Sequence, residues 1–339
     1  MKQFIKYLML FALLGFVSCS ESEDLDNATI YEAASPATKA LGDKSPMTSV
    51  YVETNDVNPL NAGDYFLADG TTFFDIVELF AANITKEETP AGTRPILMLN
   101  DKLTNILENG GVDKYVRPLQ ELGIKVHLTV IGHWGHIGLA NMNSVQTTQF
   151  AEILAYVVEK YGLDGIGLND EYADYPTSGY GVVNNTSFSE IIIKLHNLLP
   201  AGKMITVYDW GYTNTINSEA ADCIDYAYHG YYGSYLTSSN IIGMTNERWS
   251  PMSYNLGNYN SPNVLENHAI HAYNSGYGAI MFFNLRTRDD VDPLPVFQAI
   301  SDGAYGGTEV VCVNGNRPRD VELVDEWYKI TYDMTIQNE

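Results

Sequence analysis

The stretch YGLDGIGLNDEYADYP, residues 161–176, sets an apolar run directly before a group of polar side chains. Residues 165–168 alternate glycine with Ile and Leu, and the run then ends in Asn169, Asp170 and Glu171. An apolar run of this kind is typical of a strand that is buried in a parallel sheet. Barrels of parallel strands carry their chemistry at the carboxyl ends of the strands. The stretch therefore predicts a barrel strand with an amide and two carboxylates at its open end.

Strand-like and helix-like segments alternate on both sides of this stretch. We count eight strand candidates between residues 49 and 285, several of them separated by segments with helical spacing, such as residues 143–162. A further helix, in SFSEIIIKLHNLLP, begins with the capping-box pair Ser187 and Glu190. This alternation predicts an α/β fold of the (β/α)8 TIM-barrel type. A doubly wound open sheet is the structural alternative, but no glycine-rich phosphate fingerprint follows the first strand.

Seven of the segments end in polar or aromatic groups. They include the runs 132–134, 169–171, 208–210 and 229–232, and Asn284. Every strand must end in loop residues, so a single polar end carries little information. Seven such ends, rich in Asn and aromatic side chains, favour a sugar-binding mouth.

Composition and charge narrow the class of partner. The 339 residues carry a net charge of −23, which argues against nucleic acid because phosphate attraction requires a basic face. The 24 tyrosines suit a sugar-binding cleft, and they suit ordinary β-rich packing equally well.

The N-terminus has the pattern of an export signal. Lys2 and Lys6 precede the apolar run YLMLFALLGFV, which ends at Ser18 and Cys19. Residues 16–19 resemble a bacterial lipobox with Phe where Leu is usual, and the following SESED resembles the acidic export tag of Bacteroidetes surface lipoproteins. We predict a lipoprotein signal peptide at 1–18, a lipidated Cys19, a flexible tether at 19–45 and an outer-membrane location facing the cell surface or periplasm. An ordinary cleaved signal is the alternative.

The remaining cysteines and a group of histidines give only weak indications of a disulfide or a zinc site. Cys223 and Cys312 can pair or remain free, and the sequence does not decide between these. His127, His133 and His136 are close in sequence, but no acid or cysteine beside them completes a zinc site. We expect no metal and no cofactor.

At residues 161–175 the chain resembles the glycoside hydrolase family 18 endo-β-N-acetylglucosaminidases of the endoglycosidase H and F group. The segments YVETNDVNPLNAGDYFLADG, FFDIVELFAANI, VRPLQELGIKVHLTVIGHWG, YAYHGYYGSY and YGAIMFFNLRTRD resemble that group in order and spacing. The resemblance covers residues 48–305. It implies a TIM-type barrel at 46–305, acting as a monomer, that cuts between the two core N-acetylglucosamines of an N-linked glycan. Residues 306–339 lie outside it and alternate like one or two strands, which predicts a short C-terminal β extension.

The family's active strand has the motif D-x-x-D-x-D-x-E. Asp164 matches its first position and Glu171 its last, but Gly167 and Asn169 stand where two aspartates are usual. Family 18 uses the 2-acetamido oxygen of its own substrate as nucleophile. The resemblance therefore implies that Glu171 protonates the leaving oxygen and that Asn169 orients the acetamide without supplying a negative charge. Restoring Asp at 169 alone is then expected not to raise activity unless Asp at 167 is restored too.

The same resemblance implies a set of sugar contacts around this pair. Tyr231 and Tyr232 fall where the family's tyrosines contact the acetamide, and Phe283 falls on the pocket floor. Asp170, Trp134, Tyr208 and Asn284 complete the predicted substrate-binding set. Trp210 and Trp249 are candidate sugar platforms, and core packing is equally consistent with either.

Two other functions remain open at the level of sequence. A catalytically silent glycan-binding lipoprotein of the same fold is consistent with the altered motif, although a pure binder has little need of Glu171. Cleavage of N-acetylglucosamine polymers is the third alternative. Neither the glycan type nor the role of residues 306–339 can be read from the sequence.

Overall fold

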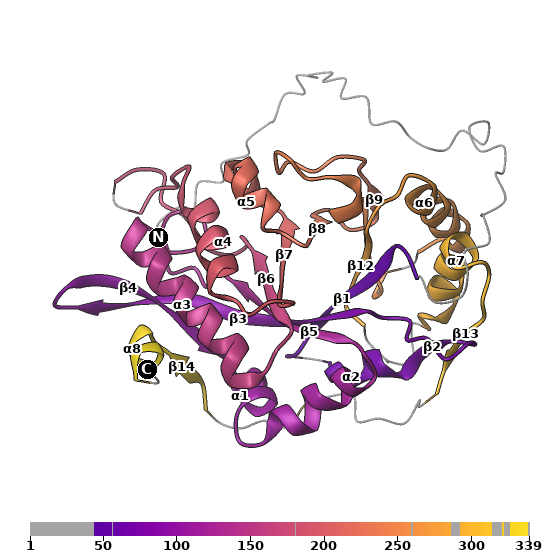
Figure 1. Cartoon of the computed structure of the whole chain (residues 1–339), viewed down its shortest axis with the longest axis horizontal. Coiled ribbons are helices and arrows are strands. Elements are labelled where there is room, and N and C mark those ends of the chain that lie inside the picture. The colour runs from indigo at the N-terminus through magenta and orange to yellow at the C-terminus, as the bar shows by residue number, and fades with distance from the viewer. Residues whose placement is uncertain are drawn as a thin grey trace, which may run out of the picture. The chain divides into compact units, whose positions relative to one another are not determined.

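Parallel strands form the centre of the structure and close on themselves (Figure 1). In spatial order they are β8 (Tyr226–His229), β7 (Met204–Asp209), β6 (Gly165–Asn169), β5 (Lys125–Ile131), β3 (Ile76–Thr89), β1 (Met47–Glu53) and β12 (Ala279–Phe283). At the two ends, β10 (Trp249–Ser250) pairs with β8, and β11 (Met252–Asn255) pairs with β12. Only Pro251 separates β10 from β11, so the two are one interrupted strand and the sheet is a barrel of the predicted type. The doubly wound alternative is wrong.

This computed structural model describes residues 44–55, 57–179, 181–258, 260–285, 292–313, 321 and 326–337. They belong to one compact unit, Thr38–Glu339. The predicted signal peptide and Cys19 lie outside the described residues, as does all of the predicted tether except residues 44 and 45. Among the described helices, none combines the length and the apolar character that a membrane crossing needs.

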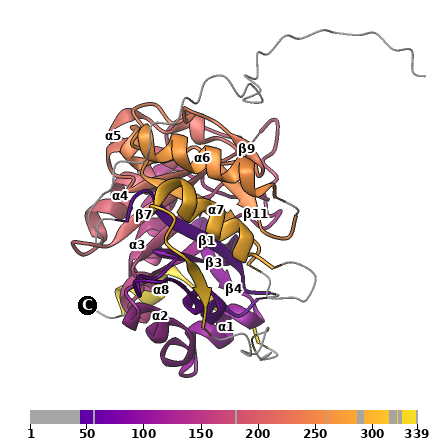
Figure 2. The same ribbon diagram turned by 90° about the vertical axis from the view of Figure 1, so that its right-hand side faces the viewer.

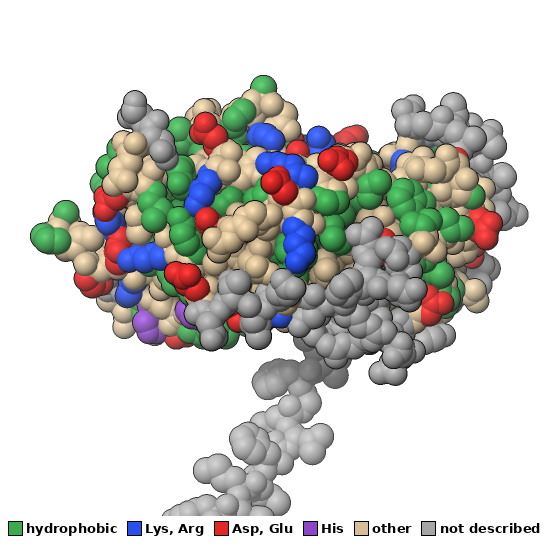
Figure 3. Space-filling view, turned by 90° about the horizontal axis from the view of Figure 1, so that it is seen from below, with side chains coloured by type: hydrophobic (Ala, Val, Ile, Leu, Met, Phe, Trp, Pro, Cys, Tyr) green, Lys and Arg blue, Asp and Glu red, His purple; other side chains and the backbone are tan. Residues whose placement is uncertain are grey.

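Helices cover the outside of the barrel. They are α1 (Asp101–Leu107), α2 (Arg117–Glu121), α3 (Ser144–Tyr161), α4 (Ser187–Leu198), α5 (Ser218–Asp222), α6 (Pro262–Asn274) and α7 (Leu294–Ala304), with α8 (Tyr332–Ile336) near the C-terminus. Figure 2 shows α6 and α7 side by side on the outer face of the barrel. On the face seen in Figure 3, acidic and basic side chains are interspersed.

Local sequence explains where α3 begins and ends. Asn143 caps its first turn, and Gln146 returns the hydrogen bond to the Asn143 backbone, which makes a capping box. Gly162 ends the helix in the left-handed conformation at φ +59°. The predicted apolar face, which includes Phe150, Ile153 and Val157, is fully buried.

The capping box predicted for α4 is wrong. The residue before the helix is Thr186, whose side chain makes no capping hydrogen bond, and the Ser187 backbone N–H donates to Asn184 Oδ1 at 2.8 Å. The Ser187 hydroxyl instead accepts from the backbone N–H of Met142 and donates to the carbonyl of Leu139. The Ser187 hydroxyl therefore hydrogen-bonds to the preceding loop, whereas the local sequence pattern predicted that it would cap the helix.

Several connections depart from simple strand–helix alternation. β4 (Gly92–Leu99) forms an antiparallel hairpin with β3. After β1 come a 3₁₀ turn (Pro59–Asp64) and β2 (Tyr65–Leu67), and after β8 comes β9 (Ser234–Tyr235), without an α-helix among the described residues of either connection. Two short strands follow α7: β13 (Val310–Cys312) pairs with β2, and β14 (Tyr328–Ile330) pairs with β4. Whether residues 306–339 form a unit of their own stays a prediction.

The hydrophobic core has two parts. The larger lies between the barrel and its helices and contains side chains such as Phe73, Phe150 and Phe297. The smaller lies inside the barrel and consists of Tyr51, Tyr208, Tyr228, Ala279 and Met281. Tyrosines in this inner group bring hydroxyls into the barrel, so its interior can support polar groups. Cys223 and Cys312, which the sequence left undecided, are both free thiols.

Candidate active site

Asn169 and Glu171 form a hydrogen-bonded pair at the carboxyl end of β6. The Asn169 Nδ2 donates to Glu171 Oε2 at 2.8 Å, and the backbone N–H of Glu171 donates to Asn169 Oδ1 at 3.1 Å. A backbone N–H can only donate, so it fixes the Asn169 oxygen and leaves the NH₂ group facing the carboxylate. The Asn169 oxygen keeps a second lone pair for one further donor. The two side chains thus lie on the same side, as their spacing predicts.

The environment of Glu171 suits an acid. Its side chain is half-buried, whereas Asn169 is fully buried. Burial raises the pKa of Glu171, and the hydrogen bond from Asn169 offsets only part of that effect. A raised pKa keeps a larger fraction of the carboxyl protonated near neutral pH, which is the state that can donate to a leaving oxygen.

Asp170 makes its described contacts within the protein. Its carboxylate is 6 % exposed; the Tyr175 hydroxyl donates to one oxygen, and the Tyr212 backbone N–H donates to the other at 3.0 Å. Burial raises the pKa of Asp170 to about 7, against the lowering effect of these hydrogen bonds. Tyr175 in turn accepts from the backbone of Ala140. Asp170 therefore ties loops together, and direct contact with a substrate stays a prediction that these contacts do not favour.

Two loops beside the pair are joined along their backbones. The N–H groups of Gly132, Trp134 and His136 donate to the carbonyls of residues 171, 172 and 173. A Cβ on Gly132 would lie 2.4 Å from the Ala173 nitrogen, so only glycine permits this approach. Trp134, His136, Tyr172 and Asp174 all have positive φ. Strained residues of this kind persist where the surrounding structure holds them, and they concentrate at functional sites.

Most of the predicted sugar contacts lie in aromatic groups around the mouth. Tyr232 stacks between Tyr208 and Phe283, with ring centroids 5.9 Å and 5.2 Å away. Tyr231 packs against Trp210 at 4.9 Å and is 57 % exposed. Tyr231 and Tyr232 are exposed, and their flat faces suit the apolar faces of sugar rings. Tyr208 is 2 % exposed and its hydroxyl donates to the Gly230 carbonyl, so direct sugar contact by Tyr208 stays a prediction.

The other predicted aromatic and amide contacts differ in their exposure. Trp134 is 61 % exposed and packs against Tyr172 at 5.0 Å. Asn284 donates from Nδ2 to Asn255 Oδ1 at 3.2 Å and has φ +67°. Trp249 is buried, and its indole N–H donates to the Leu236 carbonyl. Trp249 is therefore a packing residue, whereas Trp210 remains a candidate platform.

Asp164, the first aspartate of the motif, makes contacts that stabilise the fold. Asp164 lies just before β6, at the end of the strand opposite to Glu171. It accepts from the Val126 backbone N–H at 3.0 Å and from Gln120 Nε2 at 2.7 Å. Asp164 therefore fastens β6 to β5 and to α2.

Sequence analysis missed a buried carboxylate inside the barrel. Glu78 of β3 is fully buried and binds His127, Thr129 and Thr206. Its signal was an acid within the apolar run IVELF, residues 76–80, which sequence analysis did not single out. A second missed residue, Trp327 from the C-terminal segment, is 48 % exposed with its ring 6.1 Å from that of His133.

The histidines considered for zinc serve different contacts. His127 pairs with Glu78, His136 Nδ1 lies 2.6 Å from the Asp174 carbonyl oxygen, and His133 packs against aromatic rings. Within the described ranges, no group of three or more His, Cys, Asp or Glu side chains could hold a metal ion.

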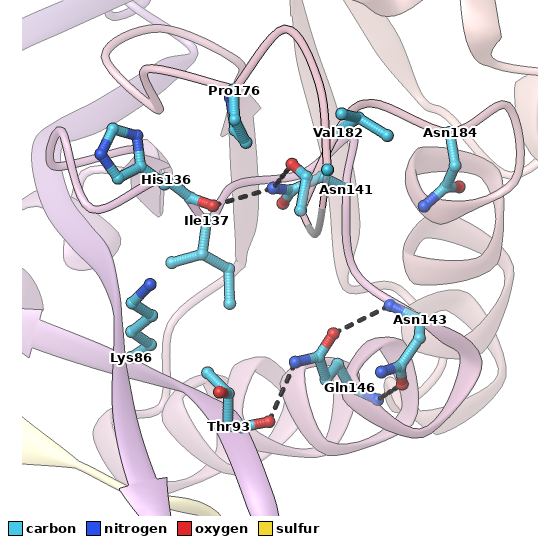
Figure 4. Close-up of a pocket in the computed structure, with 12 residues that line it drawn as sticks. Lys86, Thr93, His136, Ile137, Asn141, Asn143, Gln146, Pro176, Val182 and Asn184 are labelled. Atoms are coloured by element: carbon cyan, nitrogen blue, oxygen red, sulfur yellow. Dashed lines mark hydrogen bonds between the residues drawn. The ribbon is translucent and has the colours of Figure 1, made fainter.

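A cavity of about 450 Å³ lies next to these loops (Figure 4). Amides line much of it, but they are engaged by the protein. Asn141 donates to the carbonyls of His136 and Gly181, and Gln146 donates to the Thr93 carbonyl. The amides therefore stabilise the loops, and their contacts leave no unmet demand for a ligand.

Two known proteins with similar sequences are endo-β-N-acetylglucosaminidases. The chain is 35 % identical to an endo-β-N-acetylglucosaminidase of Flavobacterium sp. (strain SK1022) over 78 % of this chain and 82 % of that protein. It is 29 % identical to endo-β-N-acetylglucosaminidase F1 of Elizabethkingia meningoseptica over 88 % and 91 % of the two chains. The chain belongs to the endo-β-N-acetylglucosaminidase family. This glycosidase is thus a glycoside hydrolase, as its motif suggested, although no protein-family model matches it.

Solved structures that resemble the glycosidase include EndoBT-3987 and a family 18 chitinase. Bacteroides thetaiotaomicron EndoBT-3987, crystallised with a Man5GlcNAc product, matches with a TM-score of 0.67 and 26 % identity over 82 % of this chain. The match spans 64 % of the EndoBT-3987 chain, so this glycosidase corresponds to only part of that protein. A family 18 chitinase from Pseudoalteromonas aurantia matches with a TM-score of 0.52 and 17 % identity, which shows the shared fold.

Proposed function

We propose that this glycosidase hydrolyses the β-1,4 bond between the two core N-acetylglucosamines of N-linked glycans, with retention of configuration. The observation that carries the proposal is the Asn169–Glu171 pair, which sits at the carboxyl end of a barrel strand and beside exposed aromatic rings. The named relatives support the substrate class. EndoBT-3987 has also been crystallised with a Man9GlcNAc2Asn substrate, and it is 25 % identical to this chain.

Glu171 would act first as an acid and then as a base. In the first step its proton moves to the glycosidic oxygen while the acetamide oxygen of the sugar bonds to the anomeric carbon and the glycosidic bond breaks. In the second step the Glu171 carboxylate takes a proton from water as the water oxygen bonds to the anomeric carbon. The bond between that carbon and the acetamide oxygen breaks, which regenerates the acetamide. The raised pKa of Glu171 supports the first of these roles.

Asn169 would orient the acetamide. Its oxygen has a free lone pair that can accept the acetamide N–H, and this contact turns the acetamide oxygen toward the anomeric carbon. Asn169 stays neutral, so the intermediate keeps its N–H proton and carries a positive charge. Loss of one positioned stabiliser costs on the order of 10²–10³ in rate, which still leaves a glycosidase far above the uncatalysed reaction.

Incubation with an N-glycoprotein, followed by mass spectrometry, tests the proposal. We expect release of glycans that leaves one N-acetylglucosamine on the protein, and we expect Glu171→Gln to abolish it. Asp164→Asn serves as the matched control because it alters a motif carboxyl at the opposite end of β6. If the wild-type protein binds glycans but releases none, the glycan-binding alternative, which Gly167 and Asn169 keep open, replaces the hydrolase.

A further inference from the structure

Glu78 occupies the space that a side chain at position 167 would fill. A Cβ on Gly167 would lie 2.4 Å from Glu78 Oε2 and 2.8 Å from Thr129 Oγ1. A Cβ on Gly165 would lie 2.4 Å from the Met204 carbonyl oxygen and 2.9 Å from His127 Nε2. Gly167 therefore leaves the space that Glu78 occupies, and Gly165 leaves space for the neighbouring strand and for His127.

The surroundings of Glu78 require a carboxylate. Thr206 donates to Oε1 at 2.6 Å, Thr129 donates to Oε2 at 3.0 Å, and Tyr228 lies 3.3 Å from Oε1. His127 Nδ1 lies 3.2 Å from Oε1. Burial by itself would raise the pKa of Glu78, but His127 and the hydroxyls together hold it below its usual value. Glu78 is therefore a buried negative charge.

That charge lies beneath the Asn169–Glu171 pair. Position 167 is two residues before Asn169 on the same strand and faces the same side, about 7 Å lower along β6. Across the sheet, Gly167 is in register with Thr129 and Thr206, the two residues whose hydroxyls hold Glu78. The carboxylate that β6 lacks at position 167 is thus supplied by β3, which is separated from β6 by β5 alone.

We propose that Glu78 is a positioning residue that supplies, beneath the neutral Asn169, the negative charge opposite the positively charged acetamide of the intermediate. This inference rests on the proposed function, since it needs the substrate-assisted step. A sugar acetamide bound by Asn169 would lie roughly 10 Å from Glu78, where an isolated unit charge at an effective dielectric of about 20 changes a rate on the order of 10- to 20-fold. A protonated His127 beside Glu78 offsets most of this field and reduces the effect to about twofold, so these two values bound the contribution of Glu78. The charge acts on the transition state, so kcat changes and KM does not.

The position of Glu78 also determines which substitutions can restore the motif aspartate at position 167. Gly167→Asp alone would place its Cβ against Glu78, so this single variant is expected to lose stability rather than gain activity. Restoration of Asp at position 167 therefore requires Glu78 to be shortened at the same time. The double variant Glu78→Ala with Gly167→Asp returns the carboxylate to the same space from β6.

Steady-state kinetics on a purified N-glycoprotein, with thermal melting for each variant, tests the role. We expect Glu78→Gln, which keeps the size and removes the charge, to lower kcat between about twofold and tenfold with KM unchanged. We expect Glu78→Ala with Gly167→Asp to recover at least part of kcat relative to Glu78→Ala alone. The control is Asp75→Asn, which removes a part-buried ion-paired carboxylate next to the amino end of β3. It should lower the melting temperature without changing kcat.

The possible results distinguish a failure of the Glu78 role from a failure of the proposed function. An active wild-type protein with an unaltered kcat in Glu78→Gln overturns the role of Glu78 and leaves the proposed function standing. A folded Glu78→Ala, Gly167→Asp protein that gains nothing over Glu78→Ala also overturns it. A wild-type protein that releases no glycan overturns the proposed function and the role of Glu78 with it.

Discussion

Substitution of Asn169 by Asp gives the most direct test of the neutral pair. In the wild-type protein, Asn169 Nδ2 donates to Glu171 Oε2 at 2.8 Å. Aspartate would replace that donor with a second carboxylate oxygen. Two like charges about 4 Å apart repel by about 4 kcal/mol at an effective dielectric of about 20, which corresponds to roughly three pKa units. Solvent reaches half-buried Glu171, so we expect the screened shift to be roughly one to two units.

The sign of the effect follows from the shared proton. The two carboxyls titrate as a pair, and the proton that they share is lost with a pKa above that of either group in the unfolded chain. A carboxyl whose pKa is raised by folding contributes stability at low pH that is lost as pH rises through the raised value. Asn169→Asp should therefore melt closer to the wild-type protein at pH 4 than at pH 8. Its turnover should not exceed that of the wild-type protein, because Glu171 must give up this proton to act as a base.

The measurement is a pH–rate profile of kcat/KM with melting curves at matched pH values. We expect the basic limb of Asn169→Asp to move to higher pH. Asn246→Asp is the matched control. Asn246 donates to the Ser275 carbonyl, so this substitution also adds a negative charge, but the hydrogen bond that it removes is not made to a carboxylate. Strongly raised turnover in Asn169→Asp, with an unmoved basic limb, would refute the account of the pair.

Three other predictions concern residues around the site and the N-terminus. Burial raises the pKa of Asp170 to about 7, so its contribution to stability falls as pH rises from about 4 to 7. The melting temperature of the wild-type protein minus that of Asp170→Asn should fall over the same range, and a constant difference would contradict the assignment. Trp327→Ala should raise KM several-fold without changing kcat if its exposed ring extends the sugar-binding rim, whereas a lowered kcat would argue against simple binding. Cys19→Ser should release the protein from the membrane fraction of the producing cell, and retention there would exclude lipid anchoring through Cys19.

Local patterns predicted much of the fold. Residues 144–161 form a helix because their apolar side chains repeat with helical spacing between an Asn cap and a glycine stop. The strand 165–169 and its polar end follow from short-range alternation and from the direction of parallel strands. The Asn169–Glu171 pair could also be predicted from the sequence, because residues two apart on a strand share a face.

Other features depend on neighbours that are distant in sequence. Ser187 has the pattern of a cap, but the loop at 139–142 takes its hydroxyl. The sequence predicts Asp170 as a substrate contact, but Tyr175 and Tyr212 bind both of its oxygens. In each case the local pattern gives the chemistry of the side chain, and the partner comes from another element.

The sequence by itself determined that this chain would form a strand-and-helix barrel with an amide–carboxylate pair at one strand end, because periodicity, caps and residue spacing are local properties. Only the tertiary structure decided why β6 carries glycine at 165 and 167. The Glu78–His127 pair from β3 and β5 fills the space beside them. Which side chain enters a given space depends on strand register across the barrel, and register is a property of non-local pairing.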